Sequence, residues 1–99
     1  MISPILLDSY TKNGYFYLSV YPKGVCSQQI DIVLKDNIIQ RVNYFGGCSG
    51  NTQGVASLLQ GMKVEDAISR LEGIRCGMKS TSCPDQLAQA LKLYANAQP

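Results

Sequence analysis

The first half of the chain alternates apolar and polar residues with a period of two, which is typical of strands that bury one face. Two short turns interrupt the pattern: Asn13-Gly14, a common hairpin dipeptide, and Asp36-Asn37. Pro22 ends the segment that is richest in aromatic and β-branched residues. The strands predicted from this pattern are residues 5–11, 15–21, 30–35 and 38–45. Because only tight turns separate most of them, they predict an antiparallel meander.

After residue 50 the apolar period changes from two to 3.6, which predicts helices. Asn51 is expected to cap the first helix, Gly61 and Gly73 to end the first two, and Pro84 to open the third. Strands followed by helices predict an α+β domain, with a three- to four-stranded antiparallel sheet and about three helices packed on one face. The apolar positions expected to face the sheet are Val55, Leu58, Leu59 and Met62, then Val64, Ala67, Ile68 and Leu71, then Leu87, Ala88, Leu91 and Tyr94.

Length and composition exclude several classes of function. Ninety-nine residues leave room for one domain, 1–99, and 45% apolar residues are ordinary for a globular protein. A net charge of +2 without a basic cluster gives no strong nucleic-acid signal. The tyrosines at 15, 17 and 21 have no basic residues between them, which favours a sheet surface over a base-stacking platform. The absence of histidine excludes Ser-His-Asp and Cys-His catalysis and metal sites that need imidazole, and no catalytic residue is predicted.

The expected compartment is the cytoplasm, with no membrane partner. The N-terminal segment lacks the basic residues of a signal peptide, and no apolar stretch approaches the roughly 20 residues of a transmembrane helix. Structural disulfides are rare in a reducing cytoplasm, so four cysteines there indicate metal or redox chemistry.

The four cysteines, Cys26, Cys48, Cys76 and Cys83, all lie in predicted loops or at element boundaries. Glycines beside Cys26 and around Cys48 permit positive φ, so backbone amides can approach a thiolate. Cys83 precedes the third helix, whose positive dipole end favours the thiolate. A single buried cysteine is more often a small hydrophobe, but four in such loops favour a shared site. The spacing is a weak signal, because Cys76-x₆-Cys83 is not the C-x₂-C knuckle of common zinc modules.

The segment TSCPDQL, residues 81–87, contains the signature of the TSCPD domain family, which the chain resembles. Three further blocks resemble the small four-cysteine branch of that family: PKGVCS around Cys26, GGCSGN around Cys48 and GIRCG around Cys76. The resemblance covers about residues 21–91 and leaves residues 1–14 outside. Related domains lie at the C-terminal end of cobalamin-dependent ribonucleotide reductases, so the resemblance implies an accessory role in that enzyme class and in DNA synthesis. The chain is too short to be a complete reductase.

A more distant resemblance links the chain to the U-type iron–sulfur scaffold proteins. Cys26, Cys48 and Cys83 occupy the matching places. The aspartate that those scaffolds have two residues after the first cysteine is Gln28 here, and Cys76 is additional. A fourth soft thiolate in place of a carboxylate favours a closed structural site over a site that transfers a cluster.

Three hypotheses follow for these cysteines. The leading one is a non-enzymatic module that binds Zn²⁺, or alternatively an iron–sulfur cluster, through Cys26, Cys48, Cys76 and Cys83. With four protein ligands no position stays open for a catalytic water, so no hydrolase activity is expected. The second is a thiol-redox accessory that uses Cys76 and Cys83 to re-reduce ribonucleotide reductase or another redox protein. The third is an interaction domain with four inert buried cysteines. A homodimer is a further expectation, and the tyrosine-rich strand 15–21 is its candidate edge.

Overall fold

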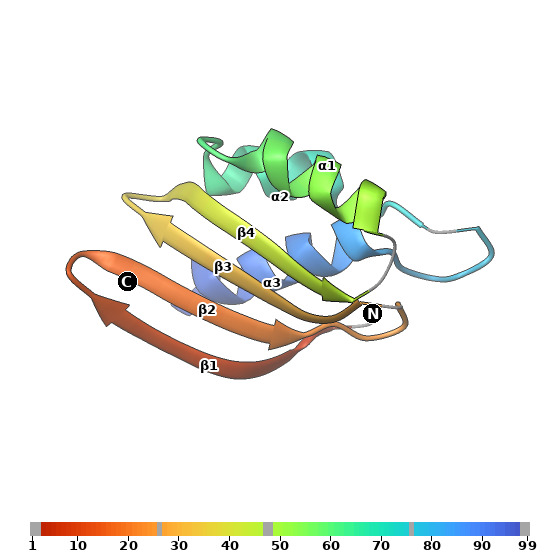
Figure 1. The fold of residues 1–99 in the computed structure, drawn as a ribbon, viewed down its shortest axis with the longest axis horizontal. Helices are drawn as coiled ribbons and strands as arrows, with labels where there is room; N and C mark the ends of the chain where they lie inside the picture. Colours follow the sequence, from red (N-terminus) through yellow and green to blue (C-terminus); the bar gives the residue numbers. More distant parts are fainter. Residues whose placement is uncertain (1–2, 26, 47–48, 76, 98–99) are drawn as a thin grey trace.

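The computed structural model describes residues 3–25, 27–46, 49–75 and 77–97 (Figure 1). Strands fill the first half and helices the second, which confirms the α+β prediction. The elements in chain order are β1 (Ile5–Lys12), β2 (Tyr15–Tyr21), β3 (Ser27–Lys35), β4 (Ile38–Gly46), α1 (Ser49–Leu59), α2 (Val64–Leu71) and α3 (Cys83–Ala97).

The four strands form one antiparallel sheet in the order β1-β2-β3-β4, which confirms the predicted meander. Both predicted turns have positive φ at both central residues, 54° and 83° at Asn13-Gly14 and 53° and 65° at Asp36-Asn37. Such turns match the right-handed twist of the flanking strands. The prediction that strand 15–21 is an edge is wrong, because β2 pairs with β1 on one side and β3 on the other. Strand β1 covers the outer side of β2, so β1 and not β2 is the edge of the sheet.

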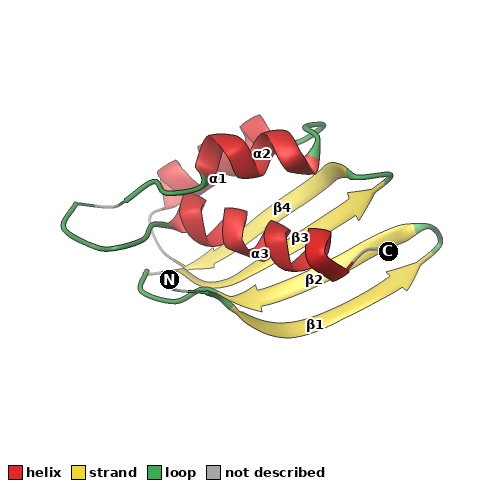
Figure 2. Ribbon diagram, turned by 180° about the vertical axis from the view of Figure 1, so that it is seen from behind, coloured by secondary structure: helices red, strands yellow, loops and turns green. Residues whose placement is uncertain are grey.

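The three helices lie on one face of the sheet, as Figure 2 shows from behind. The helix α3 crosses that face, α1 packs along β4, and α2 packs against α3. Alternate strand residues point into the core between the layers, while the intervening residues lie on the opposite face, which no helix covers. The main core residues are Leu18, Val20, Ile30, Ile32, Leu34, Ile39, Val42, Leu59, Val64, Ala67, Leu87, Ala90, Leu91 and Tyr94.

The two edges of the sheet differ. The chain between α1 and α2 runs along the start of β4, where the Ile39 N–H donates to the Met62 carbonyl at 2.9 Å and the Ile39 carbonyl accepts from the Gly61 N–H at 2.7 Å. This segment satisfies backbone groups that an edge strand exposes. All residues of β1, in contrast, are exposed, including Leu6 and Leu7 at 52% each. The open edge of the sheet is therefore β1.

The helices match the predicted apolar positions with one exception. The α3 residues that were expected to face the sheet are all buried. Gly61 and Gly73 take the left-handed backbone conformation that is expected just past the end of a helix. In α1, however, Leu59 is 3% exposed and Leu58 is 78% exposed, so the prediction for Leu58 is wrong. Neighbouring helix residues lie about 100° apart, and packing against β4 selects only the Leu59 side. The helix also begins at Ser49, which places Asn51 inside the first turn instead of at the cap.

Among the described residues, no helix is both long enough and apolar enough to span a membrane.

Candidate functional site

Cys83 is the predicted site residue that the structure describes. It is the first residue of α3, it is 9% exposed, and its thiol is free. Cys26, Cys48 and Cys76 lie outside the described residues, so their positions remain predictions. Within the described ranges no group of three or more potential metal-ligating side chains occurs.

The start of α3 is fixed by Ser82. The Ser82 carbonyl accepts the first helical hydrogen bond from Gln86 N–H at 2.8 Å, and its Oγ accepts from Asp85 N–H at 3.1 Å. These two bonds define Ser82 as the N-cap. Cys83, which was expected to precede the helix, is instead the first helical residue, and the helix begins one residue before Pro84. A serine oxygen is a stronger hydrogen-bond acceptor than a thiol, which explains why Ser82 and not Cys83 caps the helix.

Asp85 joins this helix start to the segment that precedes Cys76. Its carboxylate is 7% exposed and accepts from Gly73 N–H at 2.8 Å, from Gln89 Nε2 at 3.2 Å and from the Thr81 hydroxyl. Burial by itself raises the pKa of Asp85, but these hydrogen bonds and the charge of Lys92 outweigh it and hold the pKa below its usual value. Asp85 is therefore an ionised, fully bonded carboxylate.

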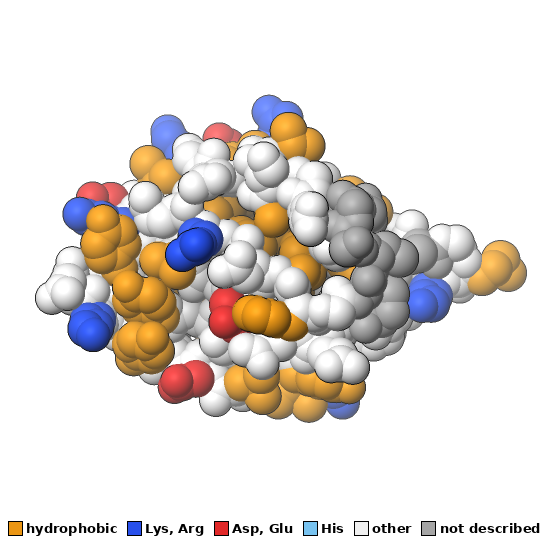
Figure 3. Space-filling model, in the orientation of Figure 1, with side chains coloured by type: hydrophobic (Ala, Val, Ile, Leu, Met, Phe, Trp, Pro, Cys, Tyr) orange, Lys and Arg blue, Asp and Glu red, His pale blue; other side chains and the backbone are white. Residues whose placement is uncertain are grey.

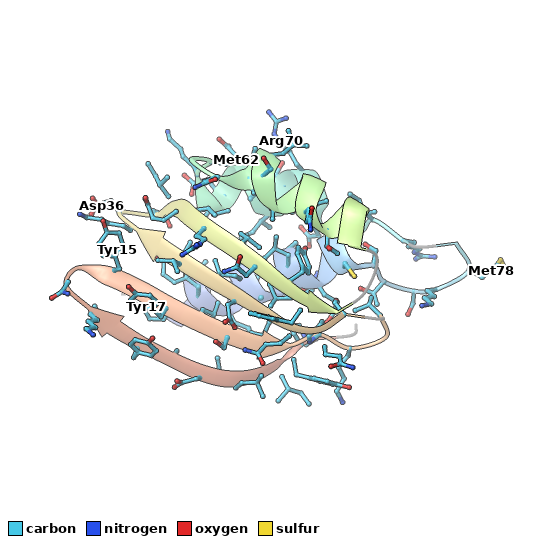
Figure 4. All side chains as sticks on the ribbon, in the orientation of Figure 1. Tyr15, Tyr17, Asp36, Met62, Arg70 and Met78 are labelled. Atoms are coloured by element: carbon cyan, nitrogen blue, oxygen red, sulfur yellow. The ribbon has the colours of Figure 1, made fainter. Side chains whose placement is uncertain are left out.

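Ser82 makes a second connection to the same segment. Its Oγ donates to the carbonyl of Ile74 at 2.6 Å. Gly73 and Ile74 thus both attach to the start of α3, shortly before the chain reaches Cys76. Beyond that point the loop projects away from the domain, and Met78 near its tip is fully exposed (Figure 4).

Gln86 and Cys83 connect α3 to the segment that contains Cys26. The Gln86 side chain is completely buried; its Oε1 accepts from Lys23 N–H at 2.8 Å and its Nε2 donates to Thr81 Oγ1 at 3.1 Å. The Cys83 thiol and the Ser27 hydroxyl are hydrogen-bonded, with Sγ and Oγ 3.1 Å apart, and Ser27 is 2% exposed. Both described flanks of Cys26 therefore contact α3.

The strand before Cys48 is attached in the same way. Tyr44 donates its hydroxyl to the Cys83 carbonyl at 3.1 Å, and Gly46 pairs with Ser27 across the β3–β4 ladder. Burial, with a smaller contribution from the nearby Cys83 thiol, raises the pKa of Tyr44 far above its ordinary value. The phenol is therefore a permanent hydrogen-bond donor at this place. Gly24 and Gly46 take positive φ, 74° and 79°, as expected for the glycines beside the first two cysteines.

The contacts together define what we call the α3 hub: Thr81, Ser82, Cys83, Asp85 and Gln86. Through it, residues from three separate segments are hydrogen-bonded to one helix start, at the end of the sheet where β2 and β4 end and β3 begins (Figure 1). Among the described residues, every buried side-chain nitrogen and oxygen has a hydrogen-bond partner. A polar network of this kind fixes a unique geometry, because each member left unpaired would carry a desolvation cost.

Sequence reasoning missed most of this hub. By its position in the sequence, Asp85 is a first-turn residue that complements the helix dipole, and Thr81 and Gln86 have no predicted role. The spacing Ser82-x-x-Asp85 is a helix-start pattern that could have indicated the cap. No local pattern could have revealed Gln86, because its partner Lys23 is 63 residues away.

A family model for the TSCPD domain matches residues 10–95. The chain belongs to the TSCPD domain family. The match begins earlier than the predicted limit of residue 21 and includes the last part of β1, so placing all of residues 1–14 outside the resemblance was wrong. No curated protein matches the chain, and no solved structure matches it.

In this TSCPD domain, the signature residues have identifiable structural roles. Ser82 caps α3, Thr81 and Asp85 bond to each other, and Cys83 directs its thiol to Ser27. Pro84 lies in the first turn of the helix, where a missing N–H costs nothing. All five signature residues are buried.

Proposed function

We propose that this TSCPD domain is a non-enzymatic, cytoplasmic metal-binding module in which Cys26, Cys48, Cys76 and Cys83 hold Zn²⁺. One observation carries the proposal: the described residues that flank Cys26, Cys48 and Cys76 are all hydrogen-bonded to the start of α3, which bears Cys83. The flanks of Cys26 bond to Gln86 and Cys83, the strand before Cys48 bonds to the Cys83 carbonyl, and the segment before Cys76 bonds to Ser82. Segments that contribute ligands to one ion must be held at one place, and the described flanks of these cysteines are bonded to the same helix start.

The chemistry of the donor set fits zinc. Four thiolates and no imidazole are typical of closed tetrahedral Zn²⁺ sites, and the same set suits an iron–sulfur cluster as the alternative cofactor. The Ser27 hydroxyl beside Cys83 Sγ is a suitable donor to a thiolate, which needs such bonds when buried. When bound, the ion would link the segments around the α3 hub and contribute structural stability.

The partner we propose is ribonucleotide reductase, with another redox protein as the alternative. The support is the membership in the TSCPD family, together with the occurrence of related domains in cobalamin-dependent reductases. The loop that contains Cys76 projects from the domain and exposes Ile74 and Met78, 41% and 103%, which suits contact with a larger enzyme.

Metal analysis tests the proposal directly. Protein purified without chelator should contain about one equivalent of zinc or the iron of a cluster, and Cys83→Ser should lose most of it. The matched control is Ser57→Ala, which alters an exposed residue of α1. A metal content below about a tenth of an equivalent in the unaltered protein would overturn the proposal.

The second candidate is a dithiol that re-reduces a reductase through Cys76 and Cys83. The free thiol of Cys83 in the first turn of α3 supports it. Thiol titration with and without a strong chelator separates the two candidates. A zinc site hides its thiols until the metal is removed, whereas a dithiol reacts at once, and four inert cysteines react slowly in both conditions.

We also propose that the chain forms a homodimer through β1. At the opposite edge the α1–α2 segment bonds to the start of β4, while β1 exposes Leu6, Leu7 and Tyr10 along the other edge of the sheet. A second copy of β1 can pair with it antiparallel, because that pairing is self-complementary about a two-fold axis. It would remove the exposed edge that proteins usually protect.

A further inference from the structure

The sheet face that points away from the helices carries a group of tyrosines. The β1–β2 register places Tyr10 opposite Tyr17 and Lys12 opposite Tyr15, so these four side chains share that face. The rings of Tyr10 and Tyr17 stack, with centroids 4.8 Å apart and planes 11° from parallel. Tyr10 is 50% exposed, and Tyr15 and Tyr17 are half-buried. Figure 3 shows the hydrophobic side chains as a column near one end of this face, and Figure 4 locates Tyr15 and Tyr17 there.

Three cations from three different strands surround these rings. Lys12 lies in β1, Lys35 of β3 places its Nζ 4.8 Å from the centre of the Tyr15 ring, and Arg41 lies in β4. Arg41 also lines a shallow cavity of about 390 Å³ beside the tyrosines. The other residues lining that cavity are Tyr15, Tyr17, Val33, Gln40 and Gln60. We call the three tyrosines and three cations the tyrosine face.

Two acidic residues, Asp8 and Asp31, lie on the same sheet face, two residue pairs further along the strands than Tyr10 and Tyr17. Asp8 lies opposite Ser19, further along the strands, and Asp31 accepts hydrogen bonds from Ser19 and Gln29, both at 2.8 Å. Asp36, in the β3–β4 turn, follows Lys35, and both line a second cavity on the helix side together with Tyr94. Lys12, Lys35 and Arg41 therefore lie beside the rings at one end of this sheet face, and Asp8 and Asp31 lie next to them towards the other end.

We propose that the tyrosine face binds single-stranded nucleic acid. Exposed tyrosine rings on an open sheet offer stacking surfaces to unpaired bases, and lysine and arginine between them neutralise the phosphates. The amides of Gln40 and Gln60 beside Arg41 add donors and acceptors for base edges. An acidic peptide would engage the cations but leave the ring faces unused, and in a duplex the bases are already stacked and out of reach. This binding is independent of Cys83, which contacts Ser27 and Tyr44 near the other end of the sheet.

Fluorescence anisotropy of the full chain with a labelled single strand of about 12 nucleotides tests the proposal. Saturable binding is expected at low salt, weaker for a duplex of the same length and weakening as salt rises. Tyr17→Leu and Tyr10→Leu, which keep an apolar strand residue but remove the ring, should each weaken binding by at least about fivefold. Arg41→Gln should reduce the slope of log affinity against log salt by about 0.7.

The matched control is Arg70→Gln, which removes the same charge from the exposed surface of α2 (Figure 4) and should leave both affinity and slope unchanged. Thermal melts followed by circular dichroism establish that each variant is folded. Three results would overturn the proposal: no saturable binding by the unaltered chain, equal loss in Arg70→Gln and Arg41→Gln, or full displacement by polyglutamate. Equal displacement by a mononucleotide and by an unlabelled strand, at the same concentration of nucleotide units, would also overturn the proposal. Linking the nucleotides into a strand would then add nothing to the affinity.

Discussion

Asp85 is a buried carboxylate that receives hydrogen bonds on both of its oxygens. Its donors come from three directions: Gly73 from the loop before Cys76, Thr81 from the residues before the helix, and Gln89 from the next turn of α3. Hydrogen bonds to a charged group contribute about 1.5–3 kcal/mol each, more than those between neutral groups. At the residue scale, this single side chain connects the loop before Cys76, the residue Thr81 before α3 and the second turn of α3.

The lowered pKa of Asp85 predicts a loss of stability in acid. A carboxylate whose pKa is lower in the folded than in the unfolded state stabilises the fold above the unfolded value, near 4. That stability is lost as the pH falls from there through the folded pKa. Urea unfolding at pH 7 and at about pH 3 should therefore give a smaller free energy of unfolding in acid.

Asp85→Asn isolates the contribution of this group. At pH 7 the variant should lose about 2 kcal/mol or more, because an amide cannot accept the three donors as well as a carboxylate does. Its stability should then depend less on pH than that of the unaltered chain. The control is Asp66→Asn, an exposed residue of α2, which should change little. An identical acid response in Asp85→Asn and in the unaltered chain would contradict the assignment.

At the element scale, α1 shows how one side of a helix is selected. Leu58 and Leu59 are adjacent and identical in type, yet only Leu59 enters the core against β4. The apolar pattern contains both residues, and only the rotation of the helix against the sheet distinguishes them.

This pair provides a matched test of the packing. Leu59→Ala should lower the free energy of unfolding by about 2–4 kcal/mol, because it removes buried methyl groups and leaves a cavity. Leu58→Ala should change it by no more than about 0.5 kcal/mol. Chemical denaturation of both variants measures the difference, and equal losses would mean that α1 is rotated relative to the arrangement described.

The edge strand β1 makes a prediction about assembly. If β1 pairs with a second copy, light scattering after gel filtration should give twice the chain mass of 10.8 kDa. Leu7→Lys places a charge on the edge and should shift the mass to that of one chain. Leu58→Lys, a similar change on an exposed residue of α1, should leave the dimer intact. A monomer for the unaltered chain at all concentrations would exclude the dimer.

At the scale of the whole molecule, the domain is small and depends on few stabilising contributions. A chain of about 100 residues buries a modest core, so a metal that links distant segments can supply a large part of its net stability. The α3 hub already gathers the segments that flank the cysteines. A ligand set completed only in the folded state converts binding energy into folding energy.

Removing the metal should therefore lower the melting temperature by more than about 10 °C, and Cys83→Ser should do the same. The measurement compares melts of the metal-bound and chelator-treated protein, with zinc added back to the treated sample as the control. Restored stability on adding zinc supports the closed structural site. Melting within a degree or two in both states would instead favour a scaffold that releases its cluster, or inert cysteines.

The amino-acid sequence by itself determined the parts of this protein that depend on neighbours along the chain. The alternation of apolar residues and the Asn13-Gly14 and Asp36-Asn37 turns predicted the meander, and the 3.6-residue period predicted α2 and α3. These signals are local, because strand faces, tight turns and helix faces are set within a few residues. The TSCPD signature identified the family in the same way.

The tertiary structure decided everything that joins distant segments. The bond from Lys23 to Gln86, the contact of Ser27 with Cys83, and the choice of β1 as the open edge involve residues that no local pattern relates. The tyrosine face illustrates the same point, because its cations come from three strands and only the register of the sheet brings them beside the rings. The physical reason is that side chains act through space, and folding alone determines which of them become neighbours.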